Sequence, residues 1–389
     1  MNHPTEDDLP SDSRDRAGAD VAPSQTDTAD DVSSLPLDDE PRFEYVHSAS
    51  LPMLLGQYQA ALVATSYQIS RILVLSSTGV KCSALLRAFP HPMGMAIRQG
   101  SMALACGNQV WELRDHKNLV ARDGSHIPYD TYFVPRASHV TGDIDAHEIA
   151  WGGTGPADWD DLWIVNTRFS CLCSLARDWS FVPRWKPPFI TAIAPEDRCH
   201  LNGLAMRDGK PAYVTCFAAA DAPQGWRENK AVSGCVLDVT SGAPVTTGLS
   251  MPHSPRWYMG KLWVLESGSG SLQTVDIRNG ARETVARLPG YARGLTFVGD
   301  HAFIGLSRAR EWRNLDGLPL ESVRDQLECA IYVVDIRTGA VAGFARVESG
   351  CAELFDIQVV RPSRRMNIVG FSKKTVDGIF IYPRTVTDH

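Results

Sequence analysis

The chain of 389 residues could form two average domains or one large one, and its 44% apolar and 21% charged residues are ordinary for a globular protein. No apolar run approaches the ~18 residues that a membrane span needs. The N-terminus shows no basic segment followed by an apolar one, so we expect a cytoplasmic protein without a membrane partner. The nine cysteines form no CxxC pair and lie in apolar runs, which favours reduced, buried thiols.

Residues 1–41 differ in composition from the rest of the chain. They hold twelve acidic residues against Arg14 and Arg16, a net charge of −10, and few large apolar residues. Such a segment cannot bury enough surface to fold, so we expect a disordered acidic tail at 1–41 and a folded domain at 42–389. Because the formal charge of the whole chain is −7, the domain sums to about +3. It has no basic stripe, and we expect no nucleic-acid partner.

Short apolar strands recur from residue 60 onward. Seven copies follow one another at intervals of 40 to 64 residues, at 60–66, 102–106, 162–167, 212–217, 262–267, 302–307 and 366–372. Most are followed by a second strand that ends in a Gly turn, as at 275–280, where Asp and Gly favour a hairpin. A third segment precedes most copies, at 91–96, 145–150, 200–205, 253–257, 291–296 and 353–358.

This pattern predicts an all-β fold. Short strands at such spacing, with Gly-rich turns and almost no helical periodicity, are typical of a β-propeller of four-stranded blades. Seven apolar strands predict seven blades, and six remain possible if one copy is miscounted. Because the last copy is short, we expect an N-terminal strand near 43–47 to close the ring and remove its exposed edges.

Two blades carry long insertions, at 218–234 and 308–328. In the second, Leu320, Val323 and Leu327 fall at helical spacing and predict a short amphipathic helix. Long loops on a rigid ring are common places for lids and partner contacts, and packing flaps without a function are an equal alternative.

The first strand of each blade lines the axis of a propeller, so equivalent repeat positions converge at one mouth of the channel. His91, His200 and His253 take one repeat position, and His147 falls two residues on, level with Asn202. Imidazoles and carboxylates together suit Fe, Zn, Cu, Mn or Ca. We therefore predict a divalent-metal site with the ligands His91, His147, His200, His253 and Glu353; neutral histidines that satisfy buried backbone groups are the alternative.

The same mouth gathers further polar residues. Glu148 and Asp356 replace the glycine of the other blades, and Arg293 stands where it could clamp a carboxylate or phosphate with two hydrogen bonds. An ion pair of Arg293 with Asp356 or Glu353, which would hold the ring together, is the alternative. We predict Glu148, Arg293 and Asp356 as catalytic residues. Asn202, Tyr291 and Arg293 are the predicted substrate-binding residues.

Two resemblances add to this interpretation. The segments "RCHLNGLA", "PHSPRWYMGKLWVLESGSGSL", "ARGLTFVGDHAFIGLS" and "ELFDIQVV" resemble a bacterial family of conserved proteins of unknown function, over roughly residues 42–385. This resemblance implies a propeller-like fold and no particular reaction. More distantly, "HLNGLA" at 200–205 is similar to a strand of gluconolactonase-type six-bladed propellers, whose Asn ligates a divalent cation on the axis. That similarity implies a ligand role for Asn202, but the family's Asp-Gly step is replaced by Arg293-Gly294 and Pro255-Arg256, so no lactonase site is carried over.

Two functions follow from the sequence. One is a metal-dependent enzyme, hydrolytic or oxidative, that acts on a small anionic molecule or a peptide at the axial mouth. The other is a non-catalytic propeller that binds a protein or peptide through the insertions and the tail. The fold cannot choose between them, because propellers support both.

Overall fold

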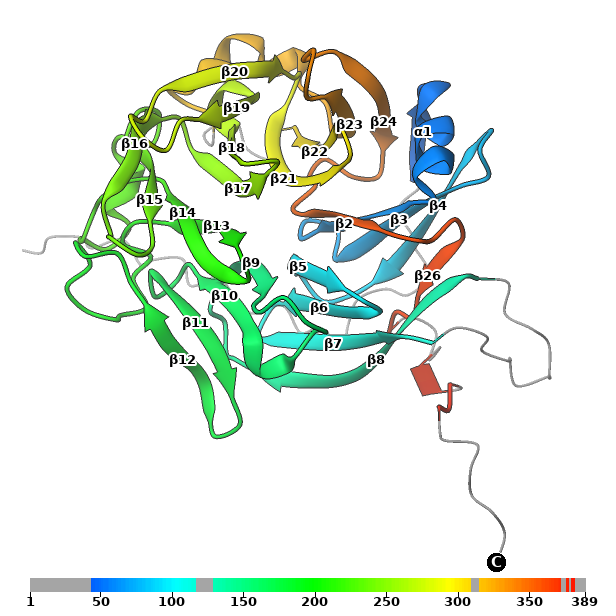
Figure 1. Ribbon diagram of the computed structural model, residues 1–389, viewed down its shortest axis with the longest axis horizontal. Coiled ribbons are helices and arrows are strands. Elements are labelled where there is room, and N and C mark those ends of the chain that lie inside the picture. Colours follow the sequence, from blue (N-terminus) through cyan, green and yellow to red (C-terminus); the bar gives the residue numbers. More distant parts are fainter. Residues whose placement is uncertain (1–42, 117–128, 309–314, 372–375, 378, 382–389) are drawn as a thin grey trace, which may run out of the picture. The chain divides into compact units, whose positions relative to one another are not determined.

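Six sheets stand around a central axis and form a β-propeller (Figure 1). The computed structural model describes residues 43–116, 129–308, 315–371, 376–377 and 379–381. The tail predicted at 1–41 lies outside these residues, and the boundary at 41/42 stays a prediction. The all-β propeller is confirmed, with six blades rather than seven among the described strands.

Four blades consist of strands that follow one another along the chain. They are β5 (Pro92–Arg98), β6 (Ser101–Cys106), β7 (Gln109–Asp115) and β8 (Thr131–Val140); β9 (Ala146–Trp151), β10 (Leu162–Asn166), β11 (Cys171–Ala176) and β12 (Trp179–Trp185); β13 (Leu201–Arg207), β14 (Lys210–Cys216), β15 (Gly234–Asp238) and β16 (Pro244–Leu249); and β17 (Pro252–Tyr258), β18 (Lys261–Glu266), β19 (Ser271–Val275) and β20 (Arg282–Arg287).

The remaining two blades combine strands from both ends of the described chain. One consists of β2 (Ala61–Ser66), β3 (Arg71–Ser77) and β4 (Cys82–Ala88) with β25 (Ile357–Val360) as its inner strand; the other consists of β21 (Tyr291–Val298), β22 (His301–Ser307), β23 (Ala330–Asp335) and β24 (Val341–Ser349) with β1 (Glu44–His47) at its outer edge. Strand β25, late in the described chain, pairs with the early strand β2 and thus closes the ring. Closure by the N-terminal strand is therefore not confirmed, since β1 pairs with β24 on the outside of a blade.

The seventh apolar segment explains the miscounted blade. It contains β26 (Met366–Ile368), which adds to the outer edge of an existing blade by pairing in parallel with β8. The strand is fully buried, as are the second strands β2 and β6. A strand buried on both faces is mainly apolar, so its composition indicates burial and not its place in a blade.

The inner strands pack closely around the axis. They contact one another in the order β25, β5, β9, β13, β17, β21 and back to β25. A Cβ on Gly94 would lie 2.8 Å from the backbone of Glu148, and one on Gly294 would lie 2.8 Å from the backbone of Ile357. Glycine is required at these points because neighbouring backbones leave no space for a side chain.

Helical segments are few. Helix α1 (Ser50–Tyr58) buries Leu51 and Leu55 against β3 and β24, and it bridges the two blades that combine both chain ends. The 3₁₀ helices are η2 (Trp159–Asp161), η3 (Gly225–Arg227), η4 (Ser267–Ser269) and η6 (Pro319–Gln326). Among the described residues, no helix is long and apolar enough to cross a bilayer.

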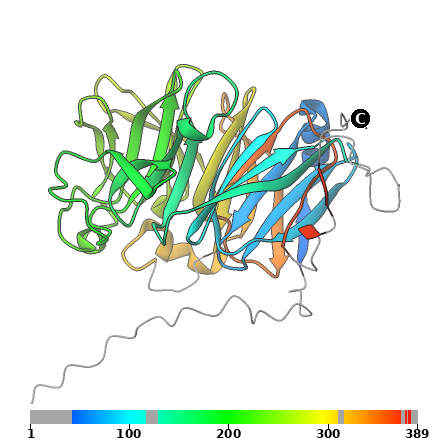
Figure 2. The ribbon, with the colours of Figure 1, turned by 90° about the horizontal axis from the view of Figure 1, so that it is seen from below.

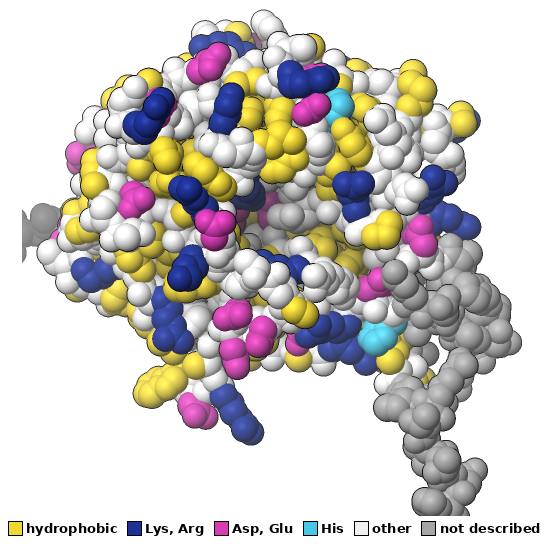
Figure 3. Space-filling view, viewed as in Figure 1, with side chains coloured by type: hydrophobic (Ala, Val, Ile, Leu, Met, Phe, Trp, Pro, Cys, Tyr) yellow, Lys and Arg dark blue, Asp and Glu magenta, His cyan; other side chains and the backbone are white. Residues whose placement is uncertain are grey.

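The two insertions meet in one apolar cluster. The segment expected to form an amphipathic helix is the 3₁₀ helix η6, interrupted by non-helical backbone at Val323, and it lies at one face of the propeller (Figure 2). Its Leu320 packs in the same cluster as Trp226 of the other insertion and Phe217 at the end of β14. Figure 3, viewed as in Figure 1, shows a face on which basic and acidic side chains are interspersed among hydrophobic ones around a central hollow.

Candidate functional site

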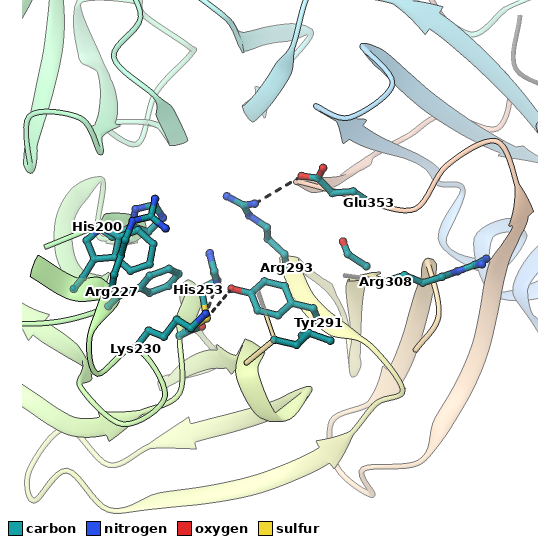
Figure 4. Close-up of a pocket in the computed structure, with 13 residues that line it drawn as sticks. His200, Arg227, Lys230, His253, Tyr291, Arg293, Arg308 and Glu353 are labelled. Atoms are coloured by element: carbon teal, nitrogen blue, oxygen red, sulfur yellow. Dashed lines mark hydrogen bonds and ion pairs between the residues drawn. The ribbon is translucent and has the colours of Figure 1, made fainter. Parts of the chain in front are cut away.

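A cavity of about 210 Å³ lies where inner strand ends meet the two insertions (Figure 4). The strand ends contribute His200, His253, Tyr291 and Arg293. The insertions contribute Trp226, Arg227, Lys230 and Leu315, and the segment before β25 contributes Glu353. We call this cavity the axial pocket.

A left-handed residue fixes where each of four inner strands begins. His91, Asp145, His200 and Met251 have φ values of 45°, 53°, 49° and 47°, and each directly precedes β5, β9, β13 or β17. In this frame His200 is equivalent to His91, whereas His147 and His253 both fall two residues later. The sequence repeat had aligned His253 with His200, and the strand register corrects this by two residues.

Three imidazoles in or beside the axial pocket are held by the same ring nitrogen. Nδ1 of His200 lies 3.0 Å from a carboxylate oxygen of Asp197, and Nδ1 of His147 lies 3.1 Å from the carbonyl of Asp145 and 3.3 Å from its carboxylate. Nδ1 of His253 lies 3.2 Å from a backbone carbonyl and 2.8 Å from the Ser267 hydroxyl, which itself donates to the carbonyl of Ala292. Carbonyls and carboxylates only accept, so Nδ1 carries the proton in each case.

This arrangement leaves Nε2 of His200 and of His253 as the acceptor atom when the ring is neutral. Burial lowers the pKa of His200, although Asp197 opposes the shift. Burial also lowers the pKa of His253 well below its usual value, and nearby Arg293 adds to the effect. Both rings are therefore neutral near pH 7, and their Nε2 atoms can accept a proton or bind a Lewis acid.

The imidazoles belong to a continuous aromatic wall. His200 lies 4.4 Å from Phe217 and 4.5 Å from Trp226 between ring centroids, and it also meets the edge of His147 at 4.8 Å. His253 continues the wall, 5.1 Å from Phe217. Such contacts fix ring orientation more firmly than apolar packing alone.

Arg293 faces this wall as an oriented cation. Its guanidinium carbon lies 3.4 Å from the centroid of Phe355, and its Nη1 lies 3.9 Å from a carboxylate oxygen of Glu353. Burial lowers the pKa of Arg293, but a guanidinium stays protonated in proteins. The alternative expected from the sequence, an ion pair of Arg293 with Glu353, is thus present with a long N–O distance. Arg293 also lines the axial pocket. Tyr291, whose pKa is raised by burial, is a neutral phenol beside it.

The predicted catalytic residues Glu148 and Asp356 lie in a separate group that does not line the axial pocket. Glu148 contacts the guanidinium of Arg256 and accepts a hydrogen bond of 3.0 Å from the backbone of Leu204. Asp356 accepts hydrogen bonds of 2.9 and 2.7 Å from the backbones of Met95 and Ile357. Both carboxylates therefore tie one blade to another.

This group also tests the cation site of gluconolactonase-type propellers. Arg256 stands beside Glu148 and Asp356 and supplies the positive charge there. Asn202 is 3% exposed, and its carbonyl oxygen accepts a hydrogen bond of 2.7 Å from Thr215. A guanidinium, a hydroxyl and backbone N–H groups contact the oxygen atoms of Glu148, Asp356 and Asn202, so a divalent cation at this place would have to replace these contacts.

The predicted metal ligands are only partly brought together. His147, His200, His253 and Glu353 lie in or beside the axial pocket, while His91 is exposed and packs 4.8 Å from the ring of Tyr67. In the described part of the chain, no three His, Cys, Asp or Glu side chains are placed to hold one ion. The metal site stays a prediction.

Several residues of the site were not foreseen from the sequence. Asp145 and Asp197 hold the imidazoles, and the short spacings Asp145-x-His147 and Asp197-x-x-His200 were the available signal. His147 and His200, together with Arg293, lower the pKa of Asp145 against the effect of its burial, so it is ionised. Nothing local in the insertions marked Trp226 as a wall of the axial pocket.

Residues 49–369 match the family described as Domain of unknown function (DUF4915). The chain belongs to this family. The resemblance to a family of propeller-like proteins of unknown function is thereby confirmed, and DUF4915 brings no established reaction.

Solved structures match this DUF4915 protein at low sequence identity and with TM-scores below 0.5. One is titled "Crystal structure of Nidogen/Laminin Complex", with 9% identity, 78% of this chain and 98% of that chain covered, and a TM-score of 0.44. Another is titled "Streptogramin B lyase structure", with 12% identity, 74% and 75% covered, and a TM-score of 0.36. No curated protein matches the DUF4915 chain in sequence.

Proposed function

We propose that the axial pocket binds a small organic anion and exchanges a proton with it. The observation that carries this proposal is that Arg293, whose guanidinium lies over the ring of Phe355, and the neutral imidazole of His253 line one small cavity. Arg227, Lys230 and Arg308 line the same cavity, against Glu353 as the acidic lining residue. An anion that enters is thus met mainly by cations, and a guanidinium can bind a carboxylate with two hydrogen bonds.

The imidazoles supply the acid–base chemistry in this proposal. A base must be unprotonated at the working pH, and the lowered pKa values of His200 and His253 meet this condition. Asp197 behind His200 fixes the ring and stabilises the imidazolium that forms when Nε2 takes a proton, as in other Asp–His pairs. Removal of a proton beside the anchored anionic group is the step that this geometry supports.

The metal-dependent enzyme expected from the sequence remains a separate proposal. His147 and His200 would be its ligands through Nε2, since hydrogen bonds from Nδ1–H to carboxylates commonly orient metal-bound imidazoles. No step described above depends on a metal.

Two measurements test the proposed function. Thermal-shift screening of acetate, benzoate, 3-phenylpropionate, citrate and phosphate should find stabilising anions in the wild-type protein. Arg293→Gln should weaken the best of them at least tenfold, because a charge-assisted pair is lost. Arg278→Gln is the matched control, since Arg278 is 85% exposed in a hairpin and pairs with Asp276. Equal binding by wild type and Arg293→Gln would contradict the anchor role.

Turnover separates an enzyme from a binding module. The bound compounds should be incubated with the protein in D₂O and followed by NMR for solvent exchange or product. Loss of this reaction in His253→Gln, with binding retained, supports proton transfer. Binding without any exchange or product supports the non-catalytic alternative instead.

A further inference from the structure

Among the charged residues of the axial pocket, Arg293 and Glu353 place a cation and an anion side by side. Arg293 and Glu353 come from neighbouring blades, and their side chains point toward one another (Figure 4). Their nearest charged atoms are 3.9 Å apart, longer than a charge-assisted hydrogen bond of about 2.8 Å. The side chains are 15% and 11% exposed, and both line the cavity. A ligand with adjacent negative and positive groups can therefore contact both.

The opposite side of the axial pocket carries apolar and aromatic side chains beside His200, Arg227 and Lys230 (Figure 4). Phe217, Trp226, Met251 and Leu315 belong to one buried cluster, against which Tyr291 packs. These residues also line the cavity. A ligand that places a charged head group between Arg293 and Glu353 must direct its remaining atoms toward this wall, so burial favours an apolar substituent.

The volume limits how large that substituent can be. The cavity of about 210 Å³ exceeds the ~150 Å³ of an apolar cavity that holds benzene, and it is below the ~300 Å³ at which drug-sized ligand sites begin. One six-membered ring and a short charged head group therefore fit.

We propose that the ligand of the axial pocket is an α-amino acid with an aromatic or large apolar side chain. This inference rests on the proposed function, because it identifies the small anion as a zwitterion. The carboxylate pairs with Arg293, the ammonium group pairs with Glu353, and the side chain packs on Phe217 and Trp226. A carboxylate alone would be repelled by Glu353, and an amine alone would be repelled by Arg293.

Four probes separate the contributions of these groups. L-Phenylalanine carries all three groups, 3-phenylpropionate lacks the ammonium group, 2-phenylethylamine lacks the carboxylate, and L-alanine lacks the ring. Isothermal titration of the full-length protein should give L-phenylalanine at least tenfold tighter binding than each of the other three, since a charged hydrogen bond contributes roughly 1.5–3 kcal/mol, or 10- to 150-fold.

Two variants assign the charges. Glu353→Gln should remove the preference for L-phenylalanine over 3-phenylpropionate, whereas Arg293→Gln should weaken both carboxylates at least tenfold. Arg278→Gln should change neither. Circular dichroism and Tm verify the fold, and Glu353→Asp replaces Glu353→Gln if the latter does not fold, with a smaller loss of the same preference expected.

The outcomes distinguish this inference from the proposed function. If 3-phenylpropionate binds as tightly as L-phenylalanine and depends on Arg293, the zwitterion is overturned and the anion site stands. If L-phenylalanine binds equally to wild type, Arg293→Gln and Glu353→Gln, it binds elsewhere and the inference is overturned. If neither these probes nor the screened anions bind, both proposals fail.

Discussion

Replacing Arg256 by methionine tests whether Glu148 and Asp356 join the blades or act on a substrate. The Arg256 side chain is 19% exposed and that of Glu148 is 8% exposed. Nε of Arg256 also donates a hydrogen bond of 2.8 Å to the carbonyl of Leu295. Removing one partner of a buried ion pair typically costs ~3–5 kcal/mol. For roughly 330 folded residues the unfolding entropy is about 0.7 kcal/mol/K, so Tm should fall by about 4–7 °C at pH 8.

The loss should depend on pH in a defined direction. Burial raises the pKa of Glu148 to about 7, despite the opposing effect of Arg256. A carboxyl with a raised folded-state pKa contributes stability that is fully present below its unfolded value near 4.3 and is lost as the pH rises through about 7. In Arg256→Met the Glu148 carboxyl is protonated at pH 5.5 and therefore needs no partner cation. At pH 8 it is either a buried charge without Arg256 or protonated at a cost in free energy. The decrease in Tm should therefore be smaller at pH 5.5, at about 1–3 °C.

Scanning calorimetry of both proteins at the two pH values measures this effect. Arg207→Met is the matched control, because Arg207 is 44% exposed and stacks 4.3 Å from the ring of Trp257. An exposed cation–π contact contributes ~0.5–1 kcal/mol, so its Tm should fall by about 1 °C. An unchanged Tm in Arg256→Met, together with loss of ligand binding, would refute the structural role of the group.

Three further predictions concern other parts of the chain. Asp197→Asn should lower the pKa of His200 further, because the carboxylate that opposes the effect of burial is removed. A ¹⁵N NMR titration measures this pKa, and an unchanged or higher value would contradict the pairing of Asp197 with His200. Trp226→Ala should destabilise the protein by ~3–5 kcal/mol, since Trp226 is 6% exposed. It should also speed proteolysis within 218–234, and cleavage at the wild-type rate would argue against the packing role of Trp226. Gly294→Ala should fail to fold or lose more than ~2 kcal/mol of unfolding free energy. Gly260→Ala should lose about 1 kcal/mol, because Gly260 has a similar positive φ but no atom within 4 Å of an added Cβ. Equal losses of unfolding free energy in the two variants would contradict the close approach at Gly294.

The repeat and its strand types could be read from the sequence because burial leaves a direct trace in composition. The second strands β2, β6, β10, β14, β18 and β22 coincide with six of the seven apolar runs. Outer strands such as β12 and β20 are largely exposed and left no such trace. β26 is as buried as a second strand, so composition could not show that it extends an existing blade.

The candidate site was found in part for a similar reason. His200, His253, Tyr291, Arg293 and Glu353 line the axial pocket because inner strands converge at one mouth, as the repeat predicted. Glu148 follows His147 directly, and side chains alternate along a strand, so their carboxylate and imidazole serve different surroundings. Sequence position alone did not distinguish residues that line the axial pocket from residues, such as Glu148, that connect two blades.

The repeat was enough to predict a propeller with polar residues near its axis, because strand periodicity and burial are local properties of each segment. Which of these residues share a cavity depends on contacts between distant segments. Arg256 reaches Glu148 of another blade, Asp197 holds His200, and Trp226 closes the pocket from an insertion. Such contacts depend on how the blades are arranged around the axis and on where the long loops pack. The sequence of a single segment does not predict either.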